Sequence, residues 1–461
     1  MSGHRLAPTI LREYDIRGIV GQTIGEDDYR AIGRAFATLM ARDDLHTIAV
    51  GYDGRLHSPL LAGALVEGLV TGGREVIEVG LGPTPLLYYA AAANGLDAAI
   101  MVTGSHNPPD YNGLKIVKAG KPFFAEQIQE LGRVAESGDW VAGPGTRAPR
   151  DLMEDYLLRI VGDYSGSKKL RVAWDPGNGA AGEAVSRLVG KLPGSHFVIN
   201  AEIDGTFPSH HPDPTVEENL DQLKTLVARE DCDLGFAFDG DGDRVGVIDG
   251  EGRVLWGDQI LCILARDVLA DEPGATIITD IKASRLFFDE IERLGGKPLM
   301  WKTGHSLIKS KMAETGSPLA GEMSAHIFFR HRYYGFDDAL YAALRLLSVV
   351  AQSKPSLADM RDAMPAYVNT PELRFDCPDE EKFQVIERVR DGLKGIAGIT
   401  VRDIDGVRVE NEDGWWLLRA SNTQAVLVAR CESGDEAGLD RLKARLAEVL
   451  AEQGLSAPHM T

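Results

Sequence analysis

Cysteine is scarce in this sequence of 461 residues, which contains only four, and no two of them form a C-x-x-C pair. That scarcity argues against a zinc site built on paired cysteines and against a disulfide framework. Long hydrophobic runs are missing too, because no stretch approaches the roughly 18 uninterrupted apolar residues that a membrane helix requires. The opening letters, MSGHRL, do not start the apolar segment of a signal peptide. We therefore expect a cytoplasmic protein with no membrane partner.

Positive charge is also in short supply. The chain has 49 Lys and Arg against 69 Asp and Glu, and its formal net charge is −20. This balance argues against a nucleic acid or an anionic membrane as partner, since both need a positive surface. A nucleotide cradle of the form G-x-x-x-x-G-K-[ST] and a kinase glycine loop are absent, which disfavours a kinase. An anionic substrate would need a local cluster of Arg, Lys or backbone N–H donors.

One structural unit recurs through most of the chain. Short apolar runs at 48–50, 172–174 and 277–278 each end in a polar turn, and amphipathic helices such as 337–352 lie between such units. Strands that alternate with helices predict α/β domains with mixed or parallel sheets. The sequence therefore predicts three related α/β domains in the first four fifths of the chain.

The last part of the chain has a different pattern. Closely spaced short strands at 407–410, 415–418 and 425–429 precede a helix over 435–452. This order predicts hairpins packed against a helix, which is a smaller α+β domain. We expect four domains with the boundaries 1–150, 151–253, 254–366 and 367–461.

A serine-bearing loop follows the apolar run 98–102, which predicts a buried parallel strand. Residues 103–108 read TGSHNP, so Ser105 lies on a loop at the carboxyl edge of the predicted sheet. Open α/β sheets bind ligands at that edge. The G-x-S-x-G elbow of hydrolases is absent, so a hydrolase triad is disfavoured. A serine beside a histidine is in many proteins only a polar turn. The case for catalysis at Ser105 depends on a second polar loop of the same kind.

That second loop, residues 239–244, reads DGDGDR and follows the apolar strand 234–238. Carboxylates at Asp239, Asp241 and Asp243 can converge on one hard cation, because the glycines between them relieve the backbone. An acidic surface turn is the plain alternative. A calcium EF-hand is excluded by spacing, because its sixth and twelfth positions would be Arg244 and Gly250. A nucleophile on one loop and a metal cage on the other suggest phosphoryl transfer through a serine.

Two further clusters lie nearer the C-terminus. Residues 419–423 read RASNT and follow a predicted strand, so Arg419 and its polar neighbours offer donors for a phosphate. Residues 322–326 read EMSAH, and this carboxylate, hydroxyl and imidazole suit the vicinal hydroxyls of a sugar. Either cluster alone could be a polar turn. The adjacent histidines His210 and His211 point in different directions in any regular backbone, and we interpret them as structural.

Taken in order, these motifs resemble those of the α-D-phosphohexomutase family, most closely its bacterial phosphomannomutase/phosphoglucomutase group. Residues 12–18 (REYDIRG) are similar to the N-terminal motif of that family, and 103–108 to its phosphoserine loop. Residues 239–244 resemble its magnesium loop, 322–326 its sugar-specificity loop, and 419–423 its phosphate loop. The resemblance covers essentially the whole chain and implies four domains around a central active-site cleft.

The resemblance implies a mechanism of two phosphoryl transfers. Phospho-Ser105 would donate to a hexose 1- or 6-phosphate, and the hexose 1,6-bisphosphate would turn over and return its other phosphate. Mg²⁺ would be held by Asp239, Asp241 and Asp243 against Ser105. The implied catalytic residues are Ser105, His106, Lys115, Arg17, His326 and Arg244. The implied substrate contacts are Tyr14, Lys282, His305, Glu322, Ser324, Arg419, Ser421, Asn422 and Thr423.

Two departures from the family pattern and several alternatives stay open. Ala325 replaces a glycine of the specificity loop, which would strain the backbone if that position needs a positive φ, and Ala425 replaces a proline of the phosphate loop. Met323 favours glucose or mannose over glucosamine. A phosphoglucosamine mutase, a phosphatase or a catalytically silent sugar-phosphate binding protein remain alternatives. The sequence leaves both a monomer and a dimer possible.

Overall fold

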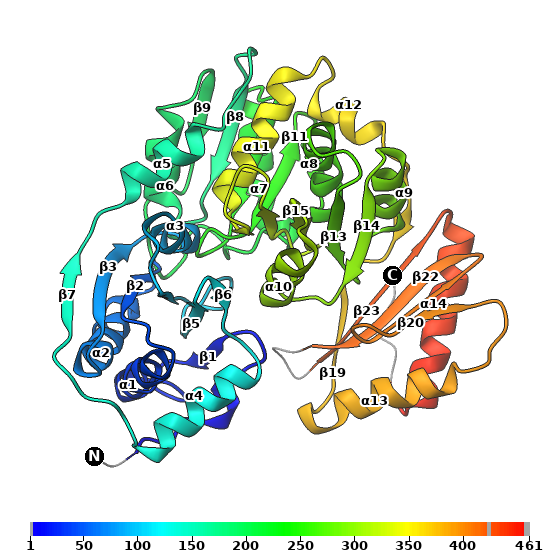
Figure 1. Ribbon diagram of the computed structural model, residues 1–461. Helices are drawn as coiled ribbons and strands as arrows, with labels where there is room; N and C mark the ends of the chain where they lie inside the picture. The colour runs from blue at the N-terminus through cyan, green and yellow to red at the C-terminus, as the bar shows by residue number, and fades with distance from the viewer. Residues whose placement is uncertain (1–2, 422–425, 456–461) are drawn as a thin grey trace.

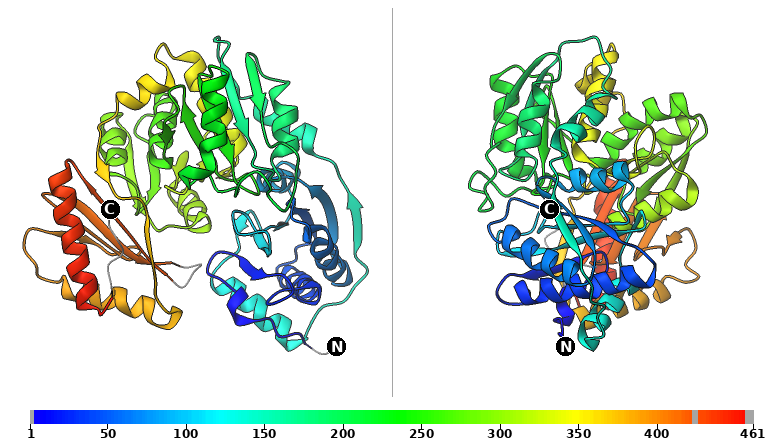
Figure 2. Two further views of the ribbon diagram at one scale, coloured as in Figure 1. Left: turned by 180° about the vertical axis from the view of Figure 1, so that it is seen from behind. Right: turned by 60° about the vertical axis from the view of Figure 1, so that its left-hand side comes forward.

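The computed structural model describes residues 3–421 and 426–455, whose strands form four sheets in the order of the chain. Figure 1 shows the four units, I to IV, following one another around an arc, and the view from behind in Figure 2 shows the same order. Among the described residues, no helix is both long and apolar enough to cross a bilayer.

Unit I has a mixed sheet with the strand order β1-β5-β4-β2-β3-β7, and β6 pairs with β5. Its elements are η1 (Pro8–Ile10), β1 (Ile16–Ile19), α1 (Glu26–Arg42), β2 (Thr47–Tyr52), α2 (Ser58–Thr71), β3 (Glu75–Leu81), α3 (Thr84–Asn94), β4 (Ala98–Val102), β5 (Tyr111–Lys118), β6 (Lys121–Pro122), α4 (Glu126–Ser137) and β7 (Thr146–Pro149). The predicted strand 98–102 is buried throughout, but it is parallel only to β2 and antiparallel to β5.

Unit II repeats this design with the order β12-β11-β10-β8-β9, in which β10, β8 and β9 are parallel and β11 and β12 antiparallel. Its elements are α5 (Met153–Val161), β8 (Arg171–Asp175), α6 (Gly182–Val189), β9 (Ser195–Val198), η2 (Glu217–Leu220), α7 (Asp221–Arg229), β10 (Leu234–Phe238), β11 (Val245–Asp249) and β12 (Val254–Leu255).

Unit III has the order β14-β13-β15-β16-β17, again parallel at its centre and antiparallel toward one edge. Its elements are α8 (Gly257–Asp271), β13 (Thr276–Asp280), α9 (Arg285–Arg293), β14 (Lys297–Trp301), α10 (His305–Thr315), β15 (Leu319–Gly321), β16 (Ile327–Phe329), β17 (Phe336–Asp337), α11 (Ala339–Gln352) and α12 (Leu357–Asp362).

Unit IV has an antiparallel sheet with the order β18-β23-β22-β21-β20, and β19 pairs with β23. Its elements are β18 (Val368–Asn369), β19 (Leu373–Asp376), α13 (Asp379–Gly392), β20 (Thr400–Arg402), β21 (Val407–Asn411), β22 (Gly414–Ala420), β23 (Val426–Ser433) and α14 (Glu436–Glu452). The predicted fold class, three α/β units and an α+β unit, is confirmed.

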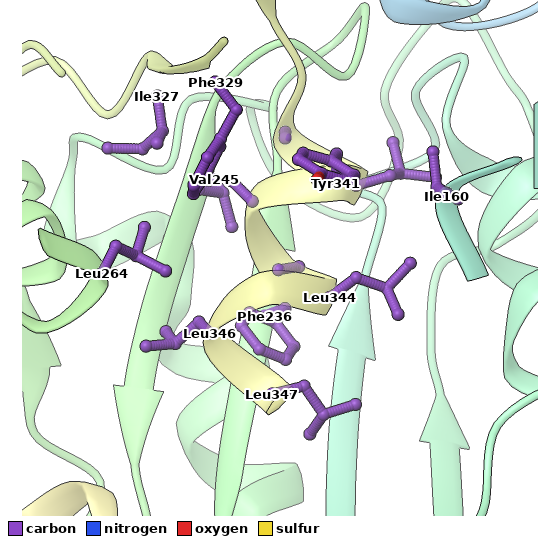
Figure 3. Close-up of a cluster of buried hydrophobic side chains, with 14 of the residues drawn as sticks. Ile160, Phe236, Val245, Leu264, Ile327, Phe329, Tyr341, Leu344, Leu346 and Leu347 are labelled. Atoms are coloured by element: carbon purple, nitrogen blue, oxygen red, sulfur yellow. The ribbon is translucent and has the colours of Figure 1, made fainter. Parts of the chain in front are cut away.

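One apolar core joins units II and III, and residues of α3, β2 and β4 of unit I also belong to it. Figure 3 shows α11 at its centre, with Leu344 and Leu347 beside Phe236 of β10 and with Tyr341 beside Phe329 of β16. Each of these side chains is at most 1% exposed. Because α11 fills the space between the two sheets, the loops at the ends of β10 and β15 are held at a fixed distance from each other. Units I and IV have cores of their own.

Candidate active site

The loop that follows β4 holds Ser105, and its backbone is fixed by a buried aspartate at the end of the neighbouring strand β2. The Asp53 carboxylate accepts hydrogen bonds from Thr103 Oγ1 at 2.8 Å and from the Gly104 backbone N–H at 3.0 Å. Thr103 Oγ1 in turn accepts from the Ser105 backbone N–H at 2.8 Å. The loop therefore has a defined shape before any ligand binds.

Arg55 completes the support of this loop from beneath. Its side chain is fully buried, and its Nη2 donates to the carbonyls of Ser105 at 2.7 Å and Asn107 at 2.6 Å. A Cβ on Gly104 would lie 2.2 Å from Arg55 Nε, so only glycine fits there. Ser105 itself has φ of 48°, a left-handed conformation that costs a serine roughly 1–3 kcal/mol. The Arg55 hydrogen bonds offset this strain.

The aspartate loop that follows β10 meets the serine loop, as the sequence predicted. Ser105 Oγ donates to Asp239 Oδ2 at 3.0 Å. A Cβ on Gly240 would lie 2.4 Å from the carbonyl oxygen of Ser105, so the two loops touch through their backbones and need glycine there. Asp239, Asp241 and Asp243 are all completely buried, and one carboxylate oxygen of each lies within 4.8 Å of the others.

Three buried carboxylates this close repel one another. Burial, together with the charges of Asp243 and Asp241, raises the pKa of Asp239 well above its usual range. Lys115 Nζ contacts both Asp241, at 2.7 Å, and Asp243, which leaves Asp241 Oδ1 buried without a hydrogen-bond partner. An oxygen-only donor set with an unpartnered oxygen and excess negative charge fits a hard divalent cation. The loop is a candidate metal site.

A second residue of unit I, outside the serine loop, also hydrogen-bonds to the aspartate loop. Thr84 at the start of α3 donates from its backbone N–H to the Asp241 carbonyl at 2.8 Å and from Oγ1 to Asp241 Oδ2 at 2.5 Å. The candidate metal site is therefore shared between units I and II. Thr84 was not predicted from the sequence, because only the tertiary fold brings it to Asp241.

The EMSAH segment of unit III is bound to the end of the aspartate loop. The Val245 backbone N–H donates to the Ala325 carbonyl at 3.1 Å. His326 lies between two carboxylates, with Nδ1 at 2.9 Å from Glu322 and Nε2 at 3.2 Å from Asp243. Burial lowers the pKa of His326, but Asp243 and Glu322 outweigh it and raise the pKa to about 9. Ser324 lies half-buried on the same turn.

Ala325 has φ of 71°, so the departure from glycine noted in the sequence does strain this turn. We expect Ala325→Gly to raise the free energy of unfolding by about 1 kcal/mol, because glycine adopts this conformation without cost. Thermal denaturation of both proteins measures the effect. Ala444→Gly on the exposed face of α14 is the matched control and should lower stability by about 1 kcal/mol. If the free energy of unfolding falls in both variants, Ala325 is not strained.

Three further predicted catalytic residues lie at the serine and aspartate loops. Arg17 donates to the Thr103 carbonyl at 3.1 Å and pairs with Asp15. His106 Nδ1 lies 3.4 Å from Ser105 Oγ, and burial together with Arg244 and Arg17 lowers the pKa of His106 well below its usual range, which keeps it neutral. Arg244 Nε lies 3.3 Å from His326 Nε2.

Two predicted substrate contacts approach from units I and III. The Tyr14 hydroxyl donates to the Thr303 carbonyl at 2.8 Å. His305, at the first position of α10, has Nδ1 at 3.8 Å from Asp337 Oδ2, and neither atom has a hydrogen-bond partner. The His305 and His326 rings have centroids 5.8 Å apart, so His305 borders the cluster around Asp243.

The remaining predicted contacts lie where units III and IV meet. Lys282 Nζ lies 3.1 Å from Glu372 of unit IV and 3.9 Å from Asp280. Arg419 at the end of β22 pairs with Asp405, and Ser421 follows it, buried, with its backbone N–H on the Val426 carbonyl. The last two predicted phosphate contacts, Asn422 and Thr423, lie outside the described residues.

His210, which the sequence analysis interpreted as structural together with His211, lies against the end of β8. Its Nε2 lies 2.9 Å from the buried Asp175 carboxylate, and its ring packs near Gly177, behind the aspartate loop. Asp175 and Asp280 are the last residues of β8 and β13, and Asp53 directly follows the last residue of β2. The three aspartates mark equivalent positions of related units.

Comparison with known proteins agrees with this geometry. Family models match the chain consecutively: phosphoglucomutase/phosphomannomutase α/β/α domain I over residues 8–142, domain II over 154–252, domain III over 256–367 and the C-terminal domain over 372–449. The chain belongs to the phosphoglucomutase/phosphomannomutase family. Its four units are thus the four domains of that family.

Relatives of this family match nearly the whole chain. A phosphomannomutase/phosphoglucomutase of Pseudomonas putida is 46% identical over 439 residues, covering 95% of this chain and 94% of its own. A phosphoglucomutase of Neisseria gonorrhoeae is 41% identical and covers 98% of both. The crystal structure of a phosphoglucomutase/phosphomannomutase family protein from Burkholderia thailandensis superimposes with a TM-score of 0.93 at 41% identity, covering 99% of this chain and 100% of that one.

Proposed function

We propose that this protein interconverts hexose 1-phosphates and hexose 6-phosphates of glucose and mannose, with Ser105 as the phosphoryl carrier. The observation that carries the proposal is the 3.0 Å contact between Ser105 Oγ and Asp239, inside a cluster of three buried aspartates. Family membership supplies the reaction type, an intramolecular phosphotransfer, and relatives carry both phosphomannomutase and phosphoglucomutase names. We also propose a cytoplasmic location and a small-molecule partner only.

The chemistry consists of two displacements at phosphorus. The hydroxyl oxygen of a bound hexose phosphate forms a bond to the phosphorus on Ser105 as the bond from phosphorus to Oγ breaks. The hydroxyl proton passes to a neighbouring base, a proton is delivered to the departing Ser105 Oγ, and a hexose 1,6-bisphosphate results. In the second displacement, Ser105 Oγ attacks the other phosphate of the bisphosphate and the bond from that phosphorus to the sugar oxygen breaks. This restores phospho-Ser105 and releases the isomeric hexose phosphate. Catalysis of such a transfer is mainly positioning and charge neutralisation.

Asp239, Asp241 and Asp243 are proposed to hold Mg²⁺, which when bound would neutralise charge on the transferring phosphoryl group. Arg244 and Arg17 add fixed positive charge beside Ser105, and neutral His106 orients its hydroxyl. Lys115 and His326, which both face Asp243, are the candidates for proton transfer.

The substrate itself is proposed to contact groups from the first, third and fourth domains. Glu322 and Ser324 would bind sugar hydroxyls, since they share the turn that carries His326. The non-transferring phosphate would lie at the junction of the third and fourth domains. Its proposed ligands are Arg419, Ser421, Asn422 and Thr423, and the proposed neighbours of the substrate are Tyr14, Lys282 and His305.

Steady-state kinetics with three substrates tests the proposal. We expect the purified protein to convert glucose 1-phosphate and mannose 1-phosphate with kcat/KM values within about tenfold of each other, and glucosamine 1-phosphate at least about a hundredfold less well. A preference for glucosamine 1-phosphate would reassign the substrate. Absence of turnover with all three sugar phosphates, at saturating Mg²⁺, would reject mutase activity and favour a catalytically silent sugar-phosphate binding protein.

A further inference from the structure

Arg419 is held by one carboxylate that no sequence motif marked. Asp405 lies on the turn before β21. Its Oδ2 accepts a hydrogen bond from Arg419 Nε at 3.2 Å and lies 3.1 Å from Arg419 Nη2. Nη2 also reaches Asp405 Oδ1 at 3.4 Å. The Arg419 side chain is 7% exposed and that of Asp405 14%. This two-point pairing fixes the plane of the guanidinium, which a single contact would leave free to rotate.

The turn that carries Asp405 is shaped for this close approach. Gly406 has φ of 89°, and a Cβ there would lie 2.5 Å from Arg419 Cβ. Asp405 can therefore contact Arg419 only because glycine follows it. Burial lowers the pKa of Arg419, but Asp405 outweighs this and raises it, so the guanidinium stays charged.

Asp405 also binds the third domain. Its Oδ2 accepts from the Thr303 backbone N–H at 3.0 Å, while the Thr303 carbonyl accepts from the Tyr14 hydroxyl of the first domain. The next N–H, that of Gly304, donates to Glu322 at 2.6 Å, and His305 follows. Three domains thus meet at residues 303–305. Asp405 is the residue of the fourth domain that accepts a hydrogen bond from the Thr303 backbone.

We propose that Asp405 is a positioning residue, which aims the Nη1 edge of Arg419 at the substrate phosphate and seats the fourth domain on residues 303–305. Among the described residues, no side chain or carbonyl is hydrogen-bonded to Nη1. A guanidinium has five N–H donors, and Asp405 occupies the Nε and Nη2 edge only. The opposite edge stays available for a phosphate. This inference rests on the proposed function of Arg419 and adds the residue that makes its geometry possible.

The test replaces Asp405 by asparagine in the full-length protein. We expect Asp405→Asn to raise KM for glucose 1-phosphate about tenfold or more, because a charge-assisted pair is lost, and to change kcat less than about threefold. Affinity for inorganic phosphate, measured by calorimetric titration, should fall by a similar factor. Asp405→Glu keeps a carboxylate near Arg419 and should recover most of the phosphate affinity.

Asp413→Asn is the matched control, since Asp413 accepts from Arg441 Nε at 2.9 Å in the same domain but on its exposed side. It should leave KM and phosphate affinity unchanged. Unchanged values in Asp405→Asn would overturn the proposal, and so would a tighter KM, which would make Asp405 a competitor of phosphate. If Asp405→Asn fails to fold, Asp405→Glu decides: loss of phosphate affinity with a normal thermal midpoint would reject the positioning role.

Failure of this proposal and failure of the proposed function are distinguishable. Wild-type turnover of the sugar phosphates tests the function and does not involve Asp405. Phosphate titration of the two Asp405 variants tests positioning and needs no turnover.

Discussion

Replacement of Ser105 by alanine is expected to lower mutase turnover by at least about 10⁴-fold, because the reaction then has no oxygen to carry the phosphoryl group between its two steps. Binding of the sugar phosphate should persist within about threefold, since Ser105 contributes one hydroxyl among many contacts. Coupled-enzyme kinetics measure the turnover, and calorimetric titration with glucose 1-phosphate measures the binding.

The same variant has a covalent readout. Intact-mass measurement of the wild-type protein after incubation with glucose 1,6-bisphosphate should show one added phosphate, and Ser105→Ala should show none. Ser186→Ala is the matched control, because its hydroxyl only donates to the Gly182 carbonyl within α6. It should keep both the phosphate and the turnover. Full activity of Ser105→Ala would remove the serine from the mechanism.

Asp241→Asn is expected to weaken Mg²⁺ binding at least about tenfold and to lower turnover by about 10²- to 10³-fold. Asparagine keeps the size and one oxygen of the side chain, but it removes one of the three charges of the cluster and an acceptor of Thr84 and Lys115. Calorimetric titration with Mg²⁺ measures the affinity directly. The rise in thermal midpoint that Mg²⁺ gives the wild-type protein should also shrink, because stabilisation by a ligand falls as its dissociation constant rises at a fixed ligand concentration.

The matched control is Asp43→Asn, which removes an aspartate that pairs with Lys118 on the exposed face of the same molecule. We expect it to leave both the Mg²⁺ titration and the turnover unchanged, since exposed pairs contribute little. If Asp241→Asn binds Mg²⁺ as tightly as the wild type, the aspartate loop is not the metal site, even if turnover falls.

The meeting of the two loops was predictable from local pattern alone. Ser105 and Asp239 each follow a buried apolar strand, and the carboxyl ends of such strands lie at one edge of a sheet. The predicted contact also requires that the first and second units pack together, which α3 of unit I provides by entering the apolar core of unit II. The three-unit repeat was predicted for the same reason, because each unit contains a short apolar strand that ends in a polar turn.

The residues that support the loops were not predicted. Asp53 and Arg55 stood in a turn already noted after its strand, but nothing in the turn shows that Arg55 would reach the carbonyls of Ser105 and Asn107. The repeat of an aspartate at 53, 175 and 280 was a signal that could have been used. Asp405 gave no signal at all, because its partners are 14 and 102 residues away in sequence. The antiparallel pairing of β5 with β4 was not predicted either, since the apolar pattern of a buried strand is the same whether the strand runs parallel or antiparallel to its neighbour.

The placement of Thr84 and Ser105 on one domain and of the aspartates on the next has a mechanical result. A metal ion or phosphoryl group bound there therefore links the first two domains, in addition to the apolar core that α3 shares with the second domain. We expect an occupied site to make the two domains unfold together, and an empty site to let the first domain unfold at a lower temperature.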